Sequence, residues 1–298
     1  MTSTATGVVV GVDGSDDSHH AVQWAAADAA RRRVPLQILH ACGGPQLRYP
    51  PPGLALPVAA GTGAGVHAER LLADAAVRAL DVSAELTVTT ELVAGRPVPA
   101  LLTASQDAAA VVVGGRGRGG FTGLLVGSTG AQLADHAACP VVVVRPRTGP
   151  AGPNESRVVV GVDGSPSAQR ALGFAVEQAT LRRCGLTAVH AYQVPVPLEA
   201  DGIAPDRYER DNLRDAARRQ LAEAIAGMGD PSPHVEIRRD VVEGGTARVL
   251  TRAGAGAELL VVGARGRGGF AGLRLGSVSR AVLHHAPCPV AVVRAHPG

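Results

Sequence analysis

The feature that most constrains this chain is the duplication of a strand, a glycine-rich loop and a helix start. Residues 111–128 read VVVGGRGRGGFTGLLVGS, and residues 260–277 read LVVGARGRGGFAGLRLGS. In each copy a β-branched run ends at a glycine, passes through a Gly/Arg loop and reaches a Gly-Ser pair. Glycines let backbone N–H groups approach an oxyanion, and a helix N-terminus adds partial positive charge. This order of elements is suited to holding phosphate.

The duplication extends over the whole chain. The sequence GVDGS at residues 11–15 recurs at residues 161–165, which is 150 residues later. The Cys-Pro pair at residues 139–140 recurs 149 residues later, at residues 288–289. A repeat of this length indicates a duplicated domain and not a solenoid, whose repeats are much shorter.

Two domains are the simplest account of this repeat. A chain of 298 residues is long enough for two domains of about 150 residues, each with its own core. The stretch 145–156, RPRTGPAGPNES, is rich in Pro and Gly and has no apolar period, as expected of a linker. We therefore expect one domain at residues 1–147 and a second at residues 157–298.

Strand-length apolar runs alternate with segments of helical periodicity in both halves. This alternation predicts an α/β fold with two tandem doubly wound parallel sheets, and ligands at the carboxyl ends of their strands. The Pro/Gly-rich stretch Gly43–Gly65 has no predicted fold and is long enough for a lid or a surface loop. The first-half strands are expected at 7–12, 36–40, 84–93, 110–114 and 140–145, and its helices at 18–32, 66–80, 98–106 and 128–136. The second-half strands are expected at 157–162, 186–190, 235–242, 259–263 and 290–294.

Composition excludes several classes of function. The chain is 46% hydrophobic and 18% charged, as expected of a compact globular protein. Its net charge of +3 is spread along the sequence, which favours a solvated surface over a polyanion track. Aromatic residues make up only 2%, which argues against nucleic-acid binding by base stacking. The sequence contains no lysine, which excludes Schiff-base chemistry and the phosphate-gripping lysines of kinases and P-loop enzymes.

The cysteines and histidines indicate structural roles. The four cysteines form no C-x-x-C pair, so neither a disulfide framework nor a zinc site is expected. Cys139 and Cys288 precede apolar runs, where a small buried hydrophobe is the favoured role. His40 and His190 correspond across the repeat at strand ends, where we expect structural histidines. The N-terminus lacks the features of a signal peptide and no apolar run is of membrane-spanning length, so we expect a cytoplasmic protein.

The spacing within the two loops carries a resemblance to a known family. Gly114 and Gly117 are separated by two residues, and Gly117 and the pair Gly127-Ser128 are separated by nine; the second half repeats this spacing from Gly263. Together with the Val-Asp-Gly-Ser turns, the Arg-Gly-Arg-Gly-Gly-Phe loops and the Cys-Pro-Val final strands, this pattern resembles the universal stress protein family in its tandem-domain form.

The resemblance implies a fold with strand order 3-2-1-4-5 in each half and one ATP per domain, expected with Mg²⁺. The glycine loop would hold the phosphates, and the aspartate after the first strand would lie near the adenosine. The nucleotide-contacting residues implied in the first half are Gly11, Asp13, Gly114, Gly117, Arg118, Gly127, Ser128 and Thr129. Those implied in the second half are Gly161, Asp163, Gly263, Gly266, Arg267, Gly276, Ser277, Val278 and Ser279.

Two departures from a uniform pattern are visible. Gly130 stands where the second half has the hydroxyl of Ser279, so the first site is expected to lack one donor, worth about 1 kcal/mol if it faces phosphate. Arg116 and Arg265 stand where many members of the family carry histidine. An arginine at these positions could pair with a phosphate or point to solvent.

The residues favour binding over chemistry. Backbone amides, a helix N-terminus and one or two arginines are sufficient for micromolar affinity, about −8 kcal/mol. Rapid hydrolysis needs at least about 8 kcal/mol of additional transition-state stabilisation, for which the sequence offers no evident source. The family resemblance implies that the protein is a nucleotide-responsive regulator of stress survival or growth. The alternatives are a slow ATP hydrolase or phosphotransferase, and a protein–protein adaptor that no longer holds nucleotide.

Three other interpretations of the loop are weaker. Gly115-x-Gly117-x-x-Gly120 matches the dinucleotide fingerprint, but it follows the fourth strand, and Ala264 breaks the match in the second copy. The Arg-Gly string resembles RNA-binding segments, but it is one short loop between core elements. A loop that needs glycines only to turn is less favoured because the nine-residue spacing occurs twice.

The remaining expectations concern partners. The resemblance implies dimerisation through the final strand, so Val141–Val144 and Ala291–Val293 are the expected interface edges, since an exposed apolar edge invites pairing. The assembly is either a homodimer or a pairing of the two halves with each other. No nucleic acid or membrane is expected as a partner, and no protein partner is identified.

Overall fold

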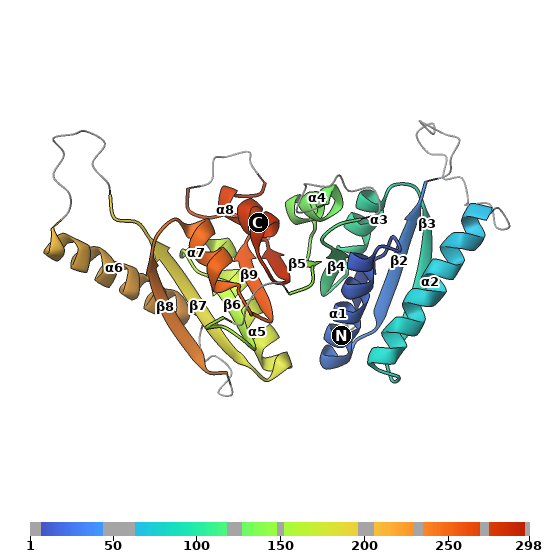
Figure 1. Cartoon of the computed structure of the whole chain (residues 1–298), viewed down its shortest axis with the longest axis horizontal. Helices are drawn as coiled ribbons and strands as arrows, with labels where there is room; N and C mark the ends of the chain where they lie inside the picture. Colours follow the sequence, from blue (N-terminus) through green and yellow to red (C-terminus); the bar gives the residue numbers. More distant parts are fainter. Residues whose placement is uncertain are drawn as a thin grey trace, which may run out of the picture. The chain divides into compact units, whose positions relative to one another are not determined.

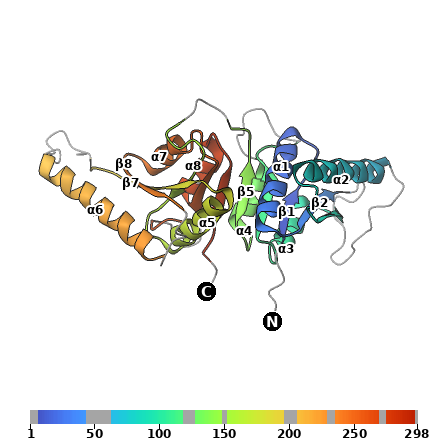
Figure 2. The ribbon, with the colours of Figure 1, turned by 90° about the horizontal axis from the view of Figure 1, so that it is seen from below.

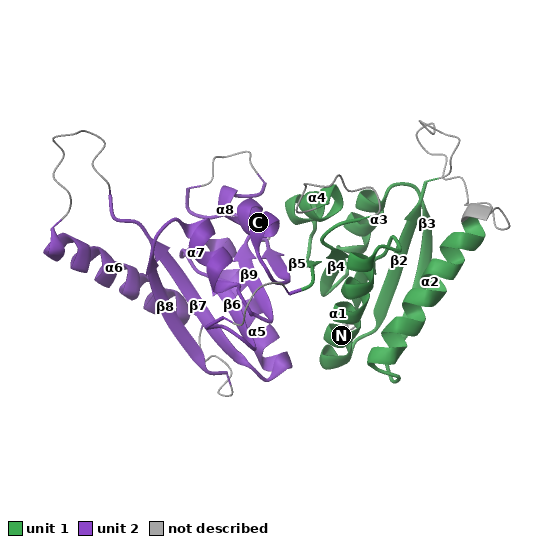
Figure 3. Cartoon of the chain, in the orientation of Figure 1, with its two compact units in different colours: residues 1–146 green, residues 147–298 purple. Residues whose placement is uncertain are grey.

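The chain folds into two compact α/β units. The computed structural model describes residues 7–43, 63–117, 127–147, 152–195, 206–228, 235–268 and 274–295. Unit 1 comprises Met1–Pro146 and unit 2 comprises Arg147–Gly298 (Figure 3). Each unit shows strands that alternate with helices along the chain (Figure 1).

Unit 1 contains a parallel sheet in which the first strand is central. Its strand order is β3-β2-β1-β4-β5, which is the expected 3-2-1-4-5. The elements are β1 (Val8–Gly11), α1 (Asp16–Arg32), β2 (Leu36–Cys42), α2 (Gly63–Val82), β3 (Val88–Ala94), α3 (Pro97–Ala104), β4 (Ala110–Gly114), α4 (Ser128–His136) and β5 (Val141–Val144).

Unit 2 repeats this arrangement. Its strands are ordered β8-β7-β6-β9-β10 and are parallel, so its first strand again lies between its second and its fourth. The elements are β6 (Arg157–Gly161), α5 (Pro166–Arg182), β7 (Gly185–Tyr192), α6 (Arg207–Ala226), β8 (Ile237–Glu243), α7 (Thr246–Ala253), β9 (Leu259–Gly263), α8 (Ser277–His285) and β10 (Val290–Val293).

Helices cover both faces of each sheet. In unit 1, α1 and α2 pack together on one face, and α3 and α4 pack together on the other (Figure 2). The central strands β1 and β4 therefore consist of buried valines, as expected for a parallel sheet covered on both sides. The alanine-rich face of α1 allows this helix to lie close to the strands; Ala21, Ala25 and Ala29 are completely buried.

Serine side chains fix where the first helix of each unit begins. The hydroxyl of Ser15 accepts a hydrogen bond from the N–H of Ser18 at 3.2 Å, and Ser165 caps α5 in the same way through Ala168. Capping satisfies one of the amides that an α-helix leaves unpaired at its start. The first helix consequently begins at Asp16, two residues before the expected start.

The third strand begins later in the sequence than the apolar pattern predicts. It was expected at 84–93 but begins at Val88, because the N–H of Leu86 bonds to the carbonyl of Ser83 in a turn after α2. Its first strand residue pairs with Leu36 at the start of β2. Most of the stretch Gly43–Gly65 lies outside the described residues, whereas α2 begins at Gly63, three residues before its expected start.

The two cysteines that correspond across the repeat lie in the protein interior. Cys139 and Cys288 are both buried, as the sequence indicated. Burial raises the pKa of the Cys139 thiol to about 12, so this side chain remains a neutral hydrophobe. Within the part of the chain that the structure describes, no cluster of His, Cys, Asp or Glu could hold a metal ion. No helix among these residues is long and apolar enough to cross a membrane.

Candidate functional site

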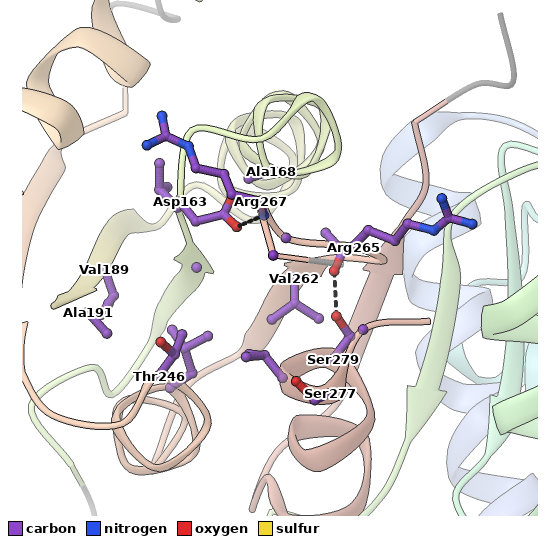
Figure 4. A pocket seen from close by; sticks show the side chains of 18 residues that line it. Asp163, Ala168, Val189, Ala191, Thr246, Val262, Arg265, Arg267, Ser277 and Ser279 are labelled. Atoms are coloured by element: carbon purple, nitrogen blue, oxygen red, sulfur yellow. Dashed lines mark hydrogen bonds between the residues drawn. The ribbon is translucent and has the colours of Figure 1, made fainter. Parts of the chain in front are cut away.

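A cavity of about 320 Å³ lies at the carboxyl ends of the central strands of unit 2 (Figure 4). Its walls come from the ends of β6, β7 and β9 and from the first turns of α7 and α8. All nine candidate residues of the second half line this cavity. They are Gly161, Asp163, Gly263, Gly266, Arg267, Gly276, Ser277, Val278 and Ser279.

Unit 1 has a smaller cavity of about 130 Å³ at the equivalent place. Ser128 is not among its lining residues, and Arg118 lies outside the described residues. The other candidates of the first half come together there. They are Gly11, Asp13, Gly114, Gly117, Gly127 and Thr129.

Each glycine loop is closed at its base by main-chain hydrogen bonds. In unit 2 the N–H of Gly276 donates to the carbonyl of Ala264 at 2.8 Å, and in unit 1 the N–H of Gly127 donates to that of Gly115 at 2.7 Å. The amides of Gly127 and Gly276 are thus already paired. They shape the loop and are not available as donors to a ligand.

The available donors are the amides of the following helical turn. The N-cap of α8 is Gly276, and that of α4 is Gly127, so neither helix has a side-chain cap. The first amides of an α-helix have no carbonyl partner within the helix. In unit 2 these are the N–H groups of Ser277, Val278 and Ser279, all of which belong to cavity-lining residues. They form a site of positive potential suited to an anion.

The aspartate after the first strand braces the glycine loop. In unit 2, Oδ1 of Asp163 accepts from the N–H of Ser165 at 2.9 Å. Its Oδ2 accepts from the N–H of Arg267 at 3.1 Å (Figure 4). A Cβ on Gly266 would lie 2.6 Å from this Oδ2. Only glycine fits at this position without displacing the carboxylate.

Asp13 has the same position in unit 1. Its Oδ1 accepts from the N–H of Ser15 at 3.0 Å and from the hydroxyl of Ser15 at 2.6 Å. A Cβ on Gly117 would lie 2.5 Å from Oδ2 of Asp13. The helix cap itself is Ser15, so Asp13 holds the turn before the helix and is not the capping residue.

Ser279 uses its hydroxyl within the protein. Its Oγ donates to the carbonyl of Gly263 at 2.6 Å and is buried. The sequence comparison with Gly130 suggested an additional donor for phosphate in the second half. The structure instead directs the hydroxyl hydrogen to the end of β9, so that Ser279 faces the cavity mainly with its main-chain amide.

The two loop arginines differ in their surroundings. In unit 1, Oδ2 of Asp17 accepts from the main-chain N of Arg116 at 2.8 Å and from its Nε at 3.4 Å. In unit 2, the N–H of Arg265 donates to the hydroxyl of Ser167 at 3.3 Å. The sequence left phosphate and solvent as options for these arginines, whereas Arg116 pairs with a carboxylate.

The histidines at the strand ends have the expected structural role. Nδ1 of His40 lies 2.7 Å from the carbonyl of Val12, and Nδ1 of His190 lies 2.7 Å from the carbonyl of Val162. Each histidine thus joins the second strand of its unit to the residue before the aspartate, Asp13 or Asp163.

Sequence reasoning missed the apolar end of each cavity. Val189 and Ala191 from β7, and Thr246 and Leu250 from α7, line the cavity of unit 2 together with the glycine loop. The signal was available, because the carboxyl ends of adjacent parallel strands meet at one edge of the sheet. The parallel topology therefore predicts that the end of β7 and the start of α7 lie at the same edge of the sheet as Asp163.

Comparison with known proteins identifies the family. The sequence pattern of the universal stress protein family matches residues 6–145 and again residues 155–294. Universal stress protein Rv2005c of Mycobacterium tuberculosis is 38% identical over 292 residues, which are 97% of each chain. Universal stress protein Rv1996 of the same organism is 37% identical over 305 aligned positions, covering 98% of this chain and 96% of that relative.

The fold agrees with these matches. The crystal structure of a universal stress protein from Archaeoglobus fulgidus matches with a TM-score of 0.67 at 21% identity, covering 99% of this chain and 98% of the other. Two family matches in tandem and relatives of the same length account for nearly the whole sequence. The chain therefore belongs to the universal stress protein family.

Proposed function

We propose that this protein binds adenine nucleotide as ATP at the carboxyl ends of its parallel strands, with one site in each unit, and that binding regulates stress survival or growth. The observation that carries the proposal is the cavity of unit 2. There the unpaired amides at the start of α8, the glycine loop and Asp163 border the same space. The regulatory role rests on membership of the family.

The cavity offers complementary surroundings to the two ends of a nucleotide. Val189, Ala191 and Leu250 supply an apolar wall for a base, and Asp163 borders the same cavity as a partner for ribose hydroxyls. The amides of α8 and the arginines of the loop supply the positive end for phosphates. A cavity of about 320 Å³ is within the usual range for small-molecule sites, about 300–1,000 Å³.

Magnesium would bind together with the phosphates and would not need a full set of protein ligands. Mg²⁺ keeps several waters and is held largely by phosphate oxygens in many nucleotide sites. Ser277, at the start of α8, lines the cavity and offers its hydroxyl as a candidate protein ligand. We assign binding and not turnover to the site, because the sequence has no lysine to assist phosphoryl transfer.

The test identifies the nucleotide that copurifies with the chain and then titrates the nucleotide-free protein with ATP·Mg. Nucleotide released by denaturation is identified by chromatography, and nucleotide-free protein is then titrated with ATP·Mg by calorimetry. We expect ATP to bind with micromolar affinity and to raise the melting temperature. Folded protein that binds no ATP would refute the proposal and favour a protein–protein adaptor. Phosphate release that is abolished by Gly266→Glu would favour the slow hydrolase instead.

A further inference from the structure

We propose that the two cavities are not equivalent: unit 2 holds the tight nucleoside triphosphate site, whereas Asp17 makes unit 1 a weak site with little preference for ATP over adenosine. This inference rests on the proposed function and specifies which unit takes the charged phosphate chain. It is argued from positions that correspond across the duplication but differ in charge and size.

Asp17 and Ser167 occupy the same place in the two units. Each is the second residue of its helix, and each accepts a hydrogen bond from the main-chain N–H of the loop arginine, Arg116 or Arg265. Asp17 is only 7% exposed, and its Oδ2 would lie 3.4 Å from a Cβ on Gly115. Unit 1 therefore carries a buried carboxylate directly against its glycine loop, where unit 2 carries a neutral hydroxyl.

This carboxylate opposes phosphate binding in two ways. A buried charge is screened less by salt and water than an exposed one, so it repels a nearby phosphate more strongly. It also engages Arg116, whose Nε lies 3.4 Å from Oδ2 of Asp17. A phosphate that recruits this arginine must first compete with the existing ion pair.

Unit 2 lacks this competition among its described residues. Ser167 is hydrogen-bonded to the carbonyl of Arg265, and no described carboxylate pairs with the Arg265 guanidinium. Arg265 lines the cavity, and its side chain points away from the other labelled residues in Figure 4. It can turn toward a phosphate without breaking an ion pair. The loop also carries Arg274 where the sequence of unit 1 has Leu125.

The apolar end of the cavity also differs between the units, and it too favours nucleotide binding in unit 2. Leu39 in unit 1 stands where unit 2 has the smaller Val189, and Pro97 stands where unit 2 has Thr246. The cavity of unit 1 is about 130 Å³ and that of unit 2 about 320 Å³. Unit 2 therefore offers more room, together with a hydroxyl that can bond to the nucleoside.

The features that the units share cannot produce this difference. Asp13 and Asp163 both accept a hydrogen bond from the N–H of the serine that caps the first helix, and both final helices begin at a glycine without a side-chain cap. Among the differences between the units, the second residue of the first helix is the one that places a carboxylate against the glycine loop of unit 1 and a hydroxyl against that of unit 2. We therefore assign the larger part of the difference in phosphate affinity to Asp17 and Ser167.

The experiment titrates the nucleotide-free full-length chain with ATP·Mg and, separately, with adenosine. We expect one tight ATP site per chain and a second site roughly tenfold weaker or more, as for loss of a charge-assisted interaction. Gly266→Val, which pushes against Asp163, should remove the tight site. The matched variant Gly117→Val should leave the tight site intact.

The exchange variants assign the effect to charge. Asp17→Asn and Asp17→Ser should strengthen ATP binding in unit 1 by roughly tenfold and leave adenosine binding unchanged. Ser167→Asp should weaken ATP binding in unit 2 by a similar factor, whereas Ser167→Asn should not. Circular dichroism checks that each variant is folded. If the Asp17 variants do not fold, comparison of Ser167→Asp with Ser167→Asn still shows whether charge causes the difference in ATP affinity.

The outcomes separate the two proposals. Two ATP sites of equal affinity, or loss of the tight site in Gly117→Val, would overturn the inference and leave the proposed function in place. An equal change for ATP and adenosine in the exchange variants would also overturn it, because charge would not be the cause. Absence of ATP binding in both units of the folded wild-type chain would instead refute the proposed function.

Discussion

The main-chain N–H of Arg267 donates to Oδ2 of Asp163 over 3.1 Å, which ties the glycine loop after β9 to the turn after β6. The second oxygen of the same carboxylate accepts from the N–H of Ser165 at 2.9 Å. One side chain thus connects the start of α5 with the loop. The loop conformation and the proposed nucleoside contact both depend on Asp163.

Replacing this aspartate should weaken nucleotide binding in unit 2. Asp163→Ala removes both acceptors, and Asp163→Asn retains only one, because its amide group cannot accept through nitrogen. Each lost hydrogen bond is worth about 1 kcal/mol, so we expect ATP affinity to fall by more than tenfold in the alanine variant and by less in the asparagine variant. Calorimetric titration measures both, and equal affinity in all three proteins would contradict this role.

A carboxylate introduced into either glycine loop should remove one bound nucleotide. Gly117→Glu places a negative side chain at the loop of unit 1, and Gly266→Glu does so in unit 2. Each also brings a Cβ to within 2.5 Å or 2.6 Å of the bracing aspartate. We expect the binding stoichiometry at saturating ATP to fall by one in each variant and to vanish in the double variant. Unchanged stoichiometry in a folded variant would exclude that loop as a site.

The sequence predicted the architecture more completely than the side-chain contacts. The alternation of strands and helices and the family resemblance predicted the strand order that unit 1 shows. The positions of the glycine loops and of Asp13 and Asp163 at the strand ends followed from the same reasoning. These features depend on main-chain geometry, which local patterns largely determine.

The contacts that distinguish the units could not be predicted in this way. Asp17 is an ordinary first-turn acid in the sequence, and only the approach of α1 to the loop shows that it contacts Arg116. Similarly, the sequence predicts a hydroxyl at Ser279 that is available to a ligand, whereas in the structure this hydroxyl donates to the carbonyl of Gly263. Such pairings depend on how elements distant in sequence pack together.

Because β9 lies close to α5, a side chain larger than that of glycine at Gly263 should lower the stability of unit 2. A Cβ on Gly263 would lie 2.8 Å from the main-chain carbon of Ser167 and 2.6 Å from its Oγ. Because backbone atoms cannot yield as a flexible side chain does, Gly263→Ala should destabilise unit 2 by about 1–3 kcal/mol. The shift in the midpoint of urea unfolding measures this effect.

A matched glycine provides the control. Gly173 lies on the exposed side of α5, and an added Cβ would meet nothing within 4 Å. Alanine is favoured over glycine within a helix by about 1 kcal/mol, so Gly173→Ala should raise the unfolding midpoint. A midpoint that rises in Gly263→Ala as well would show that β9 does not approach α5 this closely.

The buried thiol of Cys139 should make stability fall at alkaline pH. Its pKa is about 12 in the folded chain against an ordinary value of 9.0, because burial disfavours the thiolate. A pKa raised by folding gives a contribution that is fully present below pH 9 and is lost as pH rises toward 12. Between these values the unfolded chain releases the proton and the folded chain retains it, so stability falls by about 1.4 kcal/mol per pH unit.

The alkaline range is unusually free of other titrations in this protein, because the sequence has no lysine. Urea unfolding at pH 8, 9.5 and 10.5 should therefore show a declining midpoint in the wild-type chain. Cys139→Ala removes the thiol, so its midpoint should decline less steeply over the same interval, even though the cavity lowers its stability at pH 8. The difference between the two slopes isolates the thiol from the remaining cysteines and tyrosines. Parallel slopes in the two proteins would mean that Cys139 ionises as readily in the folded chain as in the unfolded one, contrary to its burial against β4.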